Sequence, residues 1–67
     1  RRSIYEVKDL PAVTAATAYC EIDDQSAIRT YEALSRWISL RSYRLAGPKR
    51  EIYLGQVLEI QFPIEPA

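Results

Sequence analysis

The sequence from 47 to 66, GPKREIYLGQVLEIQFPIEP, decides the fold because it contains two strand-like segments on either side of a turn. Apolar and polar residues alternate in it with the two-residue period of a half-buried strand. We expect strands at about 50–54 and 58–63, joined through residues 55–57. Each strand carries one carboxylate, Glu51 or Glu59, among apolar neighbours. The two faces of this hairpin must therefore differ in environment.

The alternation sorts the side chains of both strands into an apolar set and a polar set. The apolar set, which we expect to form the core, comprises Ile52, Leu54, Leu58, Ile60, Phe62 and Ile64. The opposite set, which we expect on the open face of the sheet, comprises Glu51, Tyr53, Glu59, Gln61 and Pro63. An antiparallel sheet is often solvated on one face, so a plain solvated surface is the simplest interpretation of the polar set.

The length of the connecting loop tests this assignment. A two-residue loop pairs Leu54 with Val57 and sets Glu59 opposite Ile52, on the core face. A three-residue loop pairs Leu54 with Leu58 and keeps the two apolar sets together. Because strand register follows the buried face, we predict the three-residue loop or a longer one.

Upstream, residues 12–20 (AVTAATAYC) are rich in β-branched and small side chains and predict a first strand, whose pairing Pro11 limits at its start. The next segment changes to the three- and four-residue spacing of a helix. We expect this helix at about 25–41, with Asp23 or Asp24 as its cap and a break at Gly47-Pro48. Its apolar stripe comprises Ala27, Ile28, Tyr31, Leu34 and Ile38.

The predicted order is β-α-β-β, which is an α+β module with one helix packed on a small antiparallel sheet. Residues 1–67 are expected to form a single domain. A domain of this size buries only about 60% of the surface that its unfolded chain exposes and is marginally stable. Association with a second copy, or continuation into a larger domain, would help it to fold.

Composition excludes several classes of function. Nine Lys and Arg residues balance nine Asp and Glu residues and are spread along the chain, unlike the basic patch of a nucleic-acid-binding protein. The sequence has no histidine and one cysteine, Cys20, so we expect no metal site, no internal disulfide and no cofactor. No apolar run approaches the length of a membrane span. We expect a cytoplasmic protein with no direct contact to nucleic acid or membrane.

Five short motifs occur in a distinctive order: YEAL at 31–34, RWI at 36–38, AGP at 46–48, REIY at 50–53 and EIQFPI at 59–64. In this order they resemble the GyrI-like family, the effector-binding domains of AraC-type and MerR-type multidrug regulators. The resemblance implies one βαββ half module, matching the carboxyl-terminal half of such a domain. A second copy or a missing amino-terminal half module would complete the cleft.

The resemblance also implies a ligand and the residues that bind it. Family members bind lipophilic, often cationic small molecules, and the glutamate of the REIY motif, Glu51, is the implied anchor. Tyr53, Glu59 and Gln61 would line the same wall. Trp37 and Tyr31 are implied as aromatic contributors, although their places on or beside the helix stripe equally suit packing in the core.

Two other functions stay open. A module of this type can act by contacting another protein, as gyrase-inhibitor relatives do, through an open strand edge. Some relatives hydrolyse electrophilic small molecules, in which case Glu51 would be a general base beside Tyr53. We expect no enzyme here. The environment of Glu51 distinguishes a binding site from a solvated surface. An acid that is buried among aromatic rings indicates a site, whereas a solvated acid does not.

Overall fold

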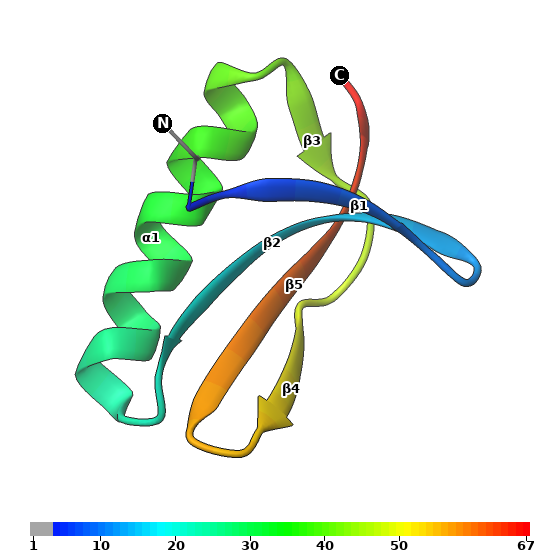
Figure 1. The fold of residues 1–67 in the computed structure, drawn as a ribbon. Helices are drawn as coiled ribbons and strands as arrows, with labels where there is room; N and C mark the ends of the chain where they lie inside the picture. The colour runs from blue at the N-terminus through cyan, green and yellow to red at the C-terminus, as the bar shows by residue number, and fades with distance from the viewer. Residues whose placement is uncertain (1–3) are drawn as a thin grey trace.

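The computed structural model describes residues 4–67 and places one helix against one face of an antiparallel sheet (Figure 1). The elements are β1 (Glu6–Leu10), β2 (Val13–Glu21), α1 (Asp24–Leu40), β3 (Tyr43–Leu45), β4 (Arg50–Leu54) and β5 (Val57–Pro66). The α+β class with a single helix on an antiparallel sheet is therefore confirmed. No helix among the described residues is long and apolar enough to cross a membrane.

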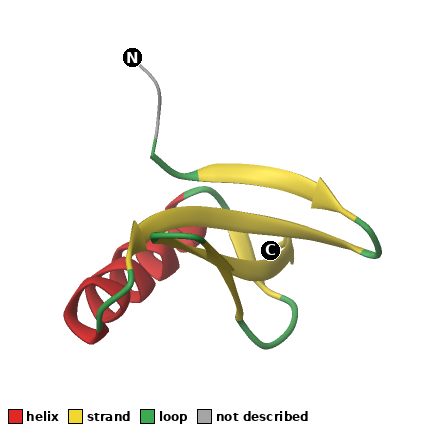
Figure 2. Cartoon of the chain, turned by 60° about the horizontal axis from the view of Figure 1, so that its bottom comes forward, coloured by secondary structure: helices red, strands yellow, loops and turns green. Residues whose placement is uncertain are grey.

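The sheet is built around β5. This strand pairs with β2 along one side, while β4 and β3 share its other side, β4 along the first half and β3 along the second. β1 pairs with the outer side of β2. Figure 2 shows α1 on one side of this sheet. The predicted order missed β1 and β3, and a strand predicted to begin at about residue 58 begins at Val57.

β1 was missed because Pro11 was taken to limit pairing. Pro11 and Ala12 instead form a two-residue turn that pairs Leu10 with Val13. Ala12 lies at the second central position with φ +71°, as a type II turn requires, and proline suits the position before it. The turn allows all five residues of β1 to pair with β2.

The β4–β5 hairpin also has a two-residue turn, Gly55-Gln56, so the predicted three-residue loop is wrong. Leu54 pairs with Val57, Tyr53 with Leu58 and Ile52 with Glu59. Gly55 has φ +70°, and glycine adopts this conformation at the first central position of a tight hairpin turn without the steric penalty of a side chain. Turn chemistry, rather than the grouping of apolar residues, therefore sets the register.

The core lies between α1, β2 and β5. Leu34 and Ile38 of the helix pack against the faces of the two strands. Ala16 and Ala18 have no bulky side chain, which allows the helix to approach β2 closely. The buried cluster comprises Ala16, Ala18, Leu34, Ile38, Leu58, Ile60, Phe62 and Ile64. It contains neither Ile52 nor Leu54, so β5 and the helix fill the core without the apolar set of β4.

The helix begins as the sequence predicts. Asp23 is the N-cap, and its carboxylate accepts a hydrogen bond of 2.8 Å from the backbone N–H of Ser26. This bond favours the ionised form and holds the pKa of the Asp23 carboxyl below its ordinary value. A lowered pKa means that the cap stabilises the helix above the pKa of the unfolded chain, and that this contribution is lost as the pH falls below it.

The register of the hairpin can be tested in solution. With the two-residue turn, Tyr53 and Leu58 form a non-hydrogen-bonded pair, as do Glu51 and Ile60, and such pairs bring their α-carbons to about 4.5 Å. We predict strong Hα–Hα nuclear Overhauser effects within both pairs. The three-residue alternative would instead give a contact between Leu54 and Leu58 and leave Tyr53 opposite Glu59.

The core assignment predicts a large effect of truncating Leu34, whose side chain has 0% of its surface exposed. We expect Leu34→Ala to lower the free energy of unfolding by about 2–5 kcal/mol, because it removes buried apolar atoms and leaves a cavity. Leu40→Ala is the matched control, since Leu40 lies on the same helix and is 77% exposed. Urea unfolding should show a change of less than about 0.5 kcal/mol for the control; equal effects would contradict the packing described.

Candidate functional site

The hairpin register places the two candidate acids on opposite faces of the sheet. Paired residues of antiparallel strands point to the same face. Glu51 and Tyr53 pair with Ile60 and Leu58 and so lie on the helix side. Glu59 pairs with Ile52 and lies on the other side. The predicted single polar face with Glu51, Tyr53, Glu59 and Gln61 together is therefore wrong.

On the helix side, Glu51 and Tyr53 border a groove of about 320 Å³. The groove runs between β4 and the first turns of α1, and we refer to it as the acidic groove. Its lining residues are Ile22, Asp23, Asp24, Ala27, Ile28, Tyr31, Glu51, Tyr53 and Leu58. Three of the six residues predicted as ligand-binding, Tyr31, Glu51 and Tyr53, thus come together here from the helix and β4.

The acidic groove combines negative charge, aromatic rings and apolar surface. Asp23, Asp24 and Glu51 supply three carboxylates, and no Lys or Arg from residues 4–67 lines it. Tyr31 is half-buried and Tyr53 is 64% exposed. Glu51 is exposed rather than enclosed by rings, as expected of an acid on a solvated face. It therefore lies at the rim of the groove.

The ring faces of this protein attract cations from within the chain. The ammonium of Lys49 lies 4.8 Å from the centroid of the Tyr31 ring. Lys8 and Tyr19 form a second such pair at 5.2 Å, and Arg41 and Trp37 a third at 5.1 Å. Three aromatic rings among residues 4–67 therefore contact cationic side chains of the same chain.

Glu59 already has a cation as its partner. The ammonium of Lys8 donates hydrogen bonds to Glu59 Oε2 at 2.8 Å and to the Tyr19 hydroxyl at 3.0 Å. The Gln61 amide donates to Glu59 Oε1 at 3.3 Å. Glu59 and Gln61 are each 6% exposed, and among the described residues nothing hydrogen-bonds to Gln61 Oε1. This cluster satisfies the buried carboxylate internally.

The hydrogen bond from Lys8 to Glu59 raises the pKa of the Lys8 ammonium above its ordinary value. A raised pKa means that the contribution of Lys8 to stability is fully present below the pKa of the unfolded chain, near 10.5, and is lost only as the pH rises further. Lys8 is thus charged throughout the neutral range, and Glu59 is not free to anchor a cationic ligand.

Trp37 lies outside the acidic groove. Its ring packs at 5.7 Å from the ring of Tyr5, and the guanidinium of Arg41 covers it. Tyr31, in contrast, has two roles, because its ring meets Phe62 edge to face at 6.3 Å and also lines the groove. The core role considered for Trp37 is the one that its contacts support.

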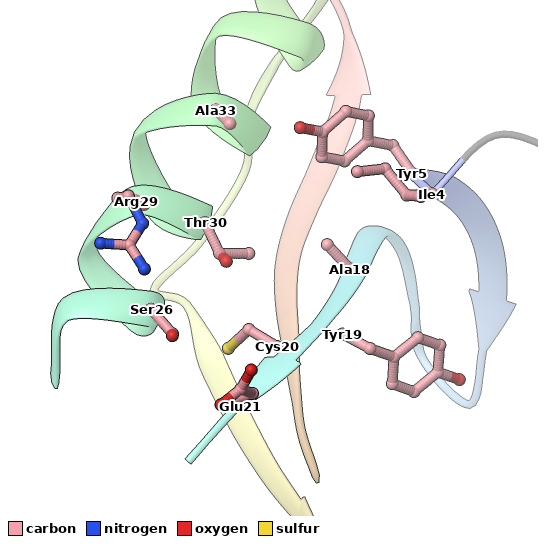
Figure 3. A pocket seen from close by; sticks show the side chains of 10 residues that line it. All are labelled: Ile4, Tyr5, Ala18, Tyr19, Cys20, Glu21, Ser26, Arg29, Thr30 and Ala33. Atoms are coloured by element: carbon pink, nitrogen blue, oxygen red, sulfur yellow. The ribbon is translucent and has the colours of Figure 1, made fainter. Parts of the chain in front are cut away.

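A second groove, of about 390 Å³, lies between α1 and the segment that leads into β1. It exists because β1 pairs with residues 13–17 of β2, which leaves residues 18–21 without a neighbour on that side among the described residues. Figure 3 shows Ile4 and Tyr5 across from Ala33 and Thr30, with Cys20 and Ser26 at the opposite end. It carries both Arg29 and Glu21, so it has no single charge preference.

The contribution of the helix start to the acidic groove was not predicted from the sequence. Asp23 and Asp24 were recognised only as capping residues, and Ile28 only as part of the core stripe, although Ile28 is exposed. The signal that could have found them was the Gly55-Gln56 turn. A two-residue loop turns Glu51 and Tyr53 toward the helix, and the acids at its start are then the nearest partners.

Comparisons of this chain with family models, with curated proteins and with solved structures found no match. The resemblance to the GyrI-like family therefore stays a prediction.

The Lys8–Glu59 pair makes a testable contribution to stability. Replacing Lys8 by Met removes the cationic partner of the nearly buried Glu59 carboxylate. We therefore expect a loss of about 1–3 kcal/mol in the free energy of unfolding at pH 7. The control is Arg44→Met, which breaks the 2.6 Å pair between Arg44 and Glu65, whose side chains are 67% and 45% exposed. Exposed pairs contribute about 0–1 kcal/mol. Chemical unfolding with equal losses for the two variants would show that Glu59 is solvated.

Proposed function

We propose that this protein is a binding module for lipophilic organic cations and that the acidic groove is its ligand site. The observation that carries the proposal is the composition of the groove, in which three carboxylates and two tyrosine rings surround apolar side chains. Cations are attracted to ring faces, and carboxylates nearby add to that attraction. Apolar lining gives affinity to the uncharged part of the ligand.

Each lining residue has a distinct role in this proposal. Glu51 and Asp24 supply the negative field at the two sides of the groove, one from β4 and the other from α1. Tyr53 provides the exposed ring, and Ile28 and Leu58 provide the apolar floor and wall. Asp23 is occupied in part by the N–H of Ser26, so it contributes charge more than direct contact.

The groove is open, and this limits what one copy of the chain can bind. Tyr53 is largely exposed and Glu51 lies at the rim, so water screens the charges of the site. We infer weak binding to a single module, in the micromolar range or above. A second copy, or a second module of the GyrI-like kind, would cover the groove and complete a closed cleft. In that setting the module would serve as the effector-sensing part of a multidrug-type regulator or as a ligand-binding protein by itself.

One observation favours a protein partner as the alternative. Several large apolar side chains are exposed near the β4–β5 turn and the start of α1, with Ile22, Ile28 and Tyr53 on the helix side and Leu54 and Val57 on the other face of the hairpin. An exposed patch of this kind often marks a contact with another protein. The two proposals differ at Leu54 and Val57, which belong to the patch and do not line the acidic groove. Neither proposal assigns Glu51 a catalytic step.

The ligand proposal is tested by isothermal titration calorimetry with tetraphenylphosphonium at low salt. We expect saturable binding that weakens about tenfold in Glu51→Gln, which corresponds to about 1.4 kcal/mol. Glu32→Gln is the matched control, because Glu32 is an exposed acid of α1 outside the groove. Its affinity should be within a factor of about two of the unsubstituted protein.

Two results would contradict the proposal. One is the absence of saturation at millimolar tetraphenylphosphonium. The other is an equal loss in Glu51→Gln and Glu32→Gln, which would mean that the cation responds to net charge rather than to a site. Calorimetry is preferable to Trp37 fluorescence, since Trp37 packs against Tyr5 and Arg41, away from the groove.

A further inference from the structure

In the protein without a ligand, the ammonium of Lys49 lies beside the acidic groove. It lies in the segment 46–49 that connects β3 to β4, next to Pro48. Its ammonium stands 4.8 Å from the centroid of the Tyr31 ring, and Tyr31 lines the groove. One ring is therefore shared between the groove and an internal cation.

The connection to β4 directs Lys49 and its neighbour Arg50 to opposite sides of the sheet. Arg50 pairs with Gln61, which lies on the side away from the helix together with Glu59. Lys49 reaches Tyr31 of the helix. Two exposed cations adjacent in sequence thus differ in the side of the sheet on which they lie and in contact with a ring of the groove.

We propose that Lys49 is an intramolecular competitor for the ligand, and that it sets the affinity and the ligand class of the groove. The inference rests on the proposed function, because it presumes that organic cations bind there. A cationic ligand that covers the face of the Tyr31 ring on which Lys49 lies must displace the Lys49 ammonium. The exchange of one cation for another on this ring yields no net cation–π attraction.

Because Lys49 must be displaced, a cation binds measurably only if it gains free energy from other contacts in the groove. The lysine ammonium is compact and strongly hydrated, and once displaced it returns to water. A ligand with the same kind of head group gains nothing from the exchange. Quaternary ammonium and phosphonium ions gain additionally from burying their carbon substituents against Ile28, Leu58 and the rings. The groove therefore selects quaternary or delocalised cations of apolar character.

The direct test follows the Lys49 side chain during a titration with benzyltrimethylammonium. Protons above a ring face resonate upfield, so the Lys49 ε-methylene signal should be shifted upfield in the free protein. At saturation it should return to the position of a solvated lysine. A signal that stays upfield at saturation would overturn the proposal, since the ligand would then bind without displacing Lys49.

Affinity gives the second measurement. Loss of one exposed cation–π competitor should tighten binding of benzyltrimethylammonium about two- to fivefold in Lys49→Gln. Arg50→Gln removes the same charge without the ring contact and should change the affinity by less. In the Tyr31→Leu background the gain from Lys49→Gln should fall to the level of Arg50→Gln. If that variant does not fold, the ε-methylene measurement decides alone.

The outcomes separate this inference from the proposed function. Absence of any saturable binding, in all variants, refutes the ligand site itself. Saturable, Glu51-dependent binding with equal affinities for Lys49→Gln and Arg50→Gln refutes only the role of Lys49.

Discussion

The pairing of Leu54 with Val57 across the Gly55-Gln56 turn is the constraint on which the rest of the structure depends. It fixes the register of the whole β4–β5 hairpin, and a shift by one residue would move every side chain of β4 to the other face. With this register, Glu51 and Tyr53 turn toward the start of α1. The same register leaves Ile52 and Leu54 on the far side with Glu59. The turn at Gly55, with its positive φ, therefore places Glu51 on the helix side of the sheet and Glu59 on the opposite side.

The carboxylates of Glu59 and Glu51 therefore lie in different environments. Glu59 is nearly buried and is held by Lys8, with Gln61 as a further donor. Removal of a charged group from water is tolerated only when a partner of opposite charge and hydrogen bonds replace the water. Glu51 is exposed, lines the same groove as Asp23 and Asp24, and forms no ion pair among the described residues, because the nearby Lys49 ammonium lies over the Tyr31 ring. Carboxylates that are not paired with a cation of the chain can attract a cationic ligand.

Much of the fold was predictable from sequence because periodicity reports burial. The apolar stripe through Leu34 and Ile38 predicts the helix, and the alternation along β5 predicts the central strand. Periodicity cannot report the pairing partner, so the register and the short strands β1 and β3 were missed. Grouping all apolar residues of the hairpin in one core was reasonable, but β5 is buried along both faces and the core is complete without β4. The acidic groove could not be predicted from the sequence, because its two sides are distant along the chain and meet only in the folded protein.

The central claim is that the acidic groove, and not the face that holds Glu59, receives an organic cation. The most direct measurement is a set of intermolecular nuclear Overhauser effects between bound benzyltrimethylammonium and the isotope-labelled protein. The account predicts contacts from the ligand methyl protons to Tyr31, Tyr53 and Ile28. Contacts to Tyr19 or Ile52 instead, on the opposite face of the sheet, would contradict it.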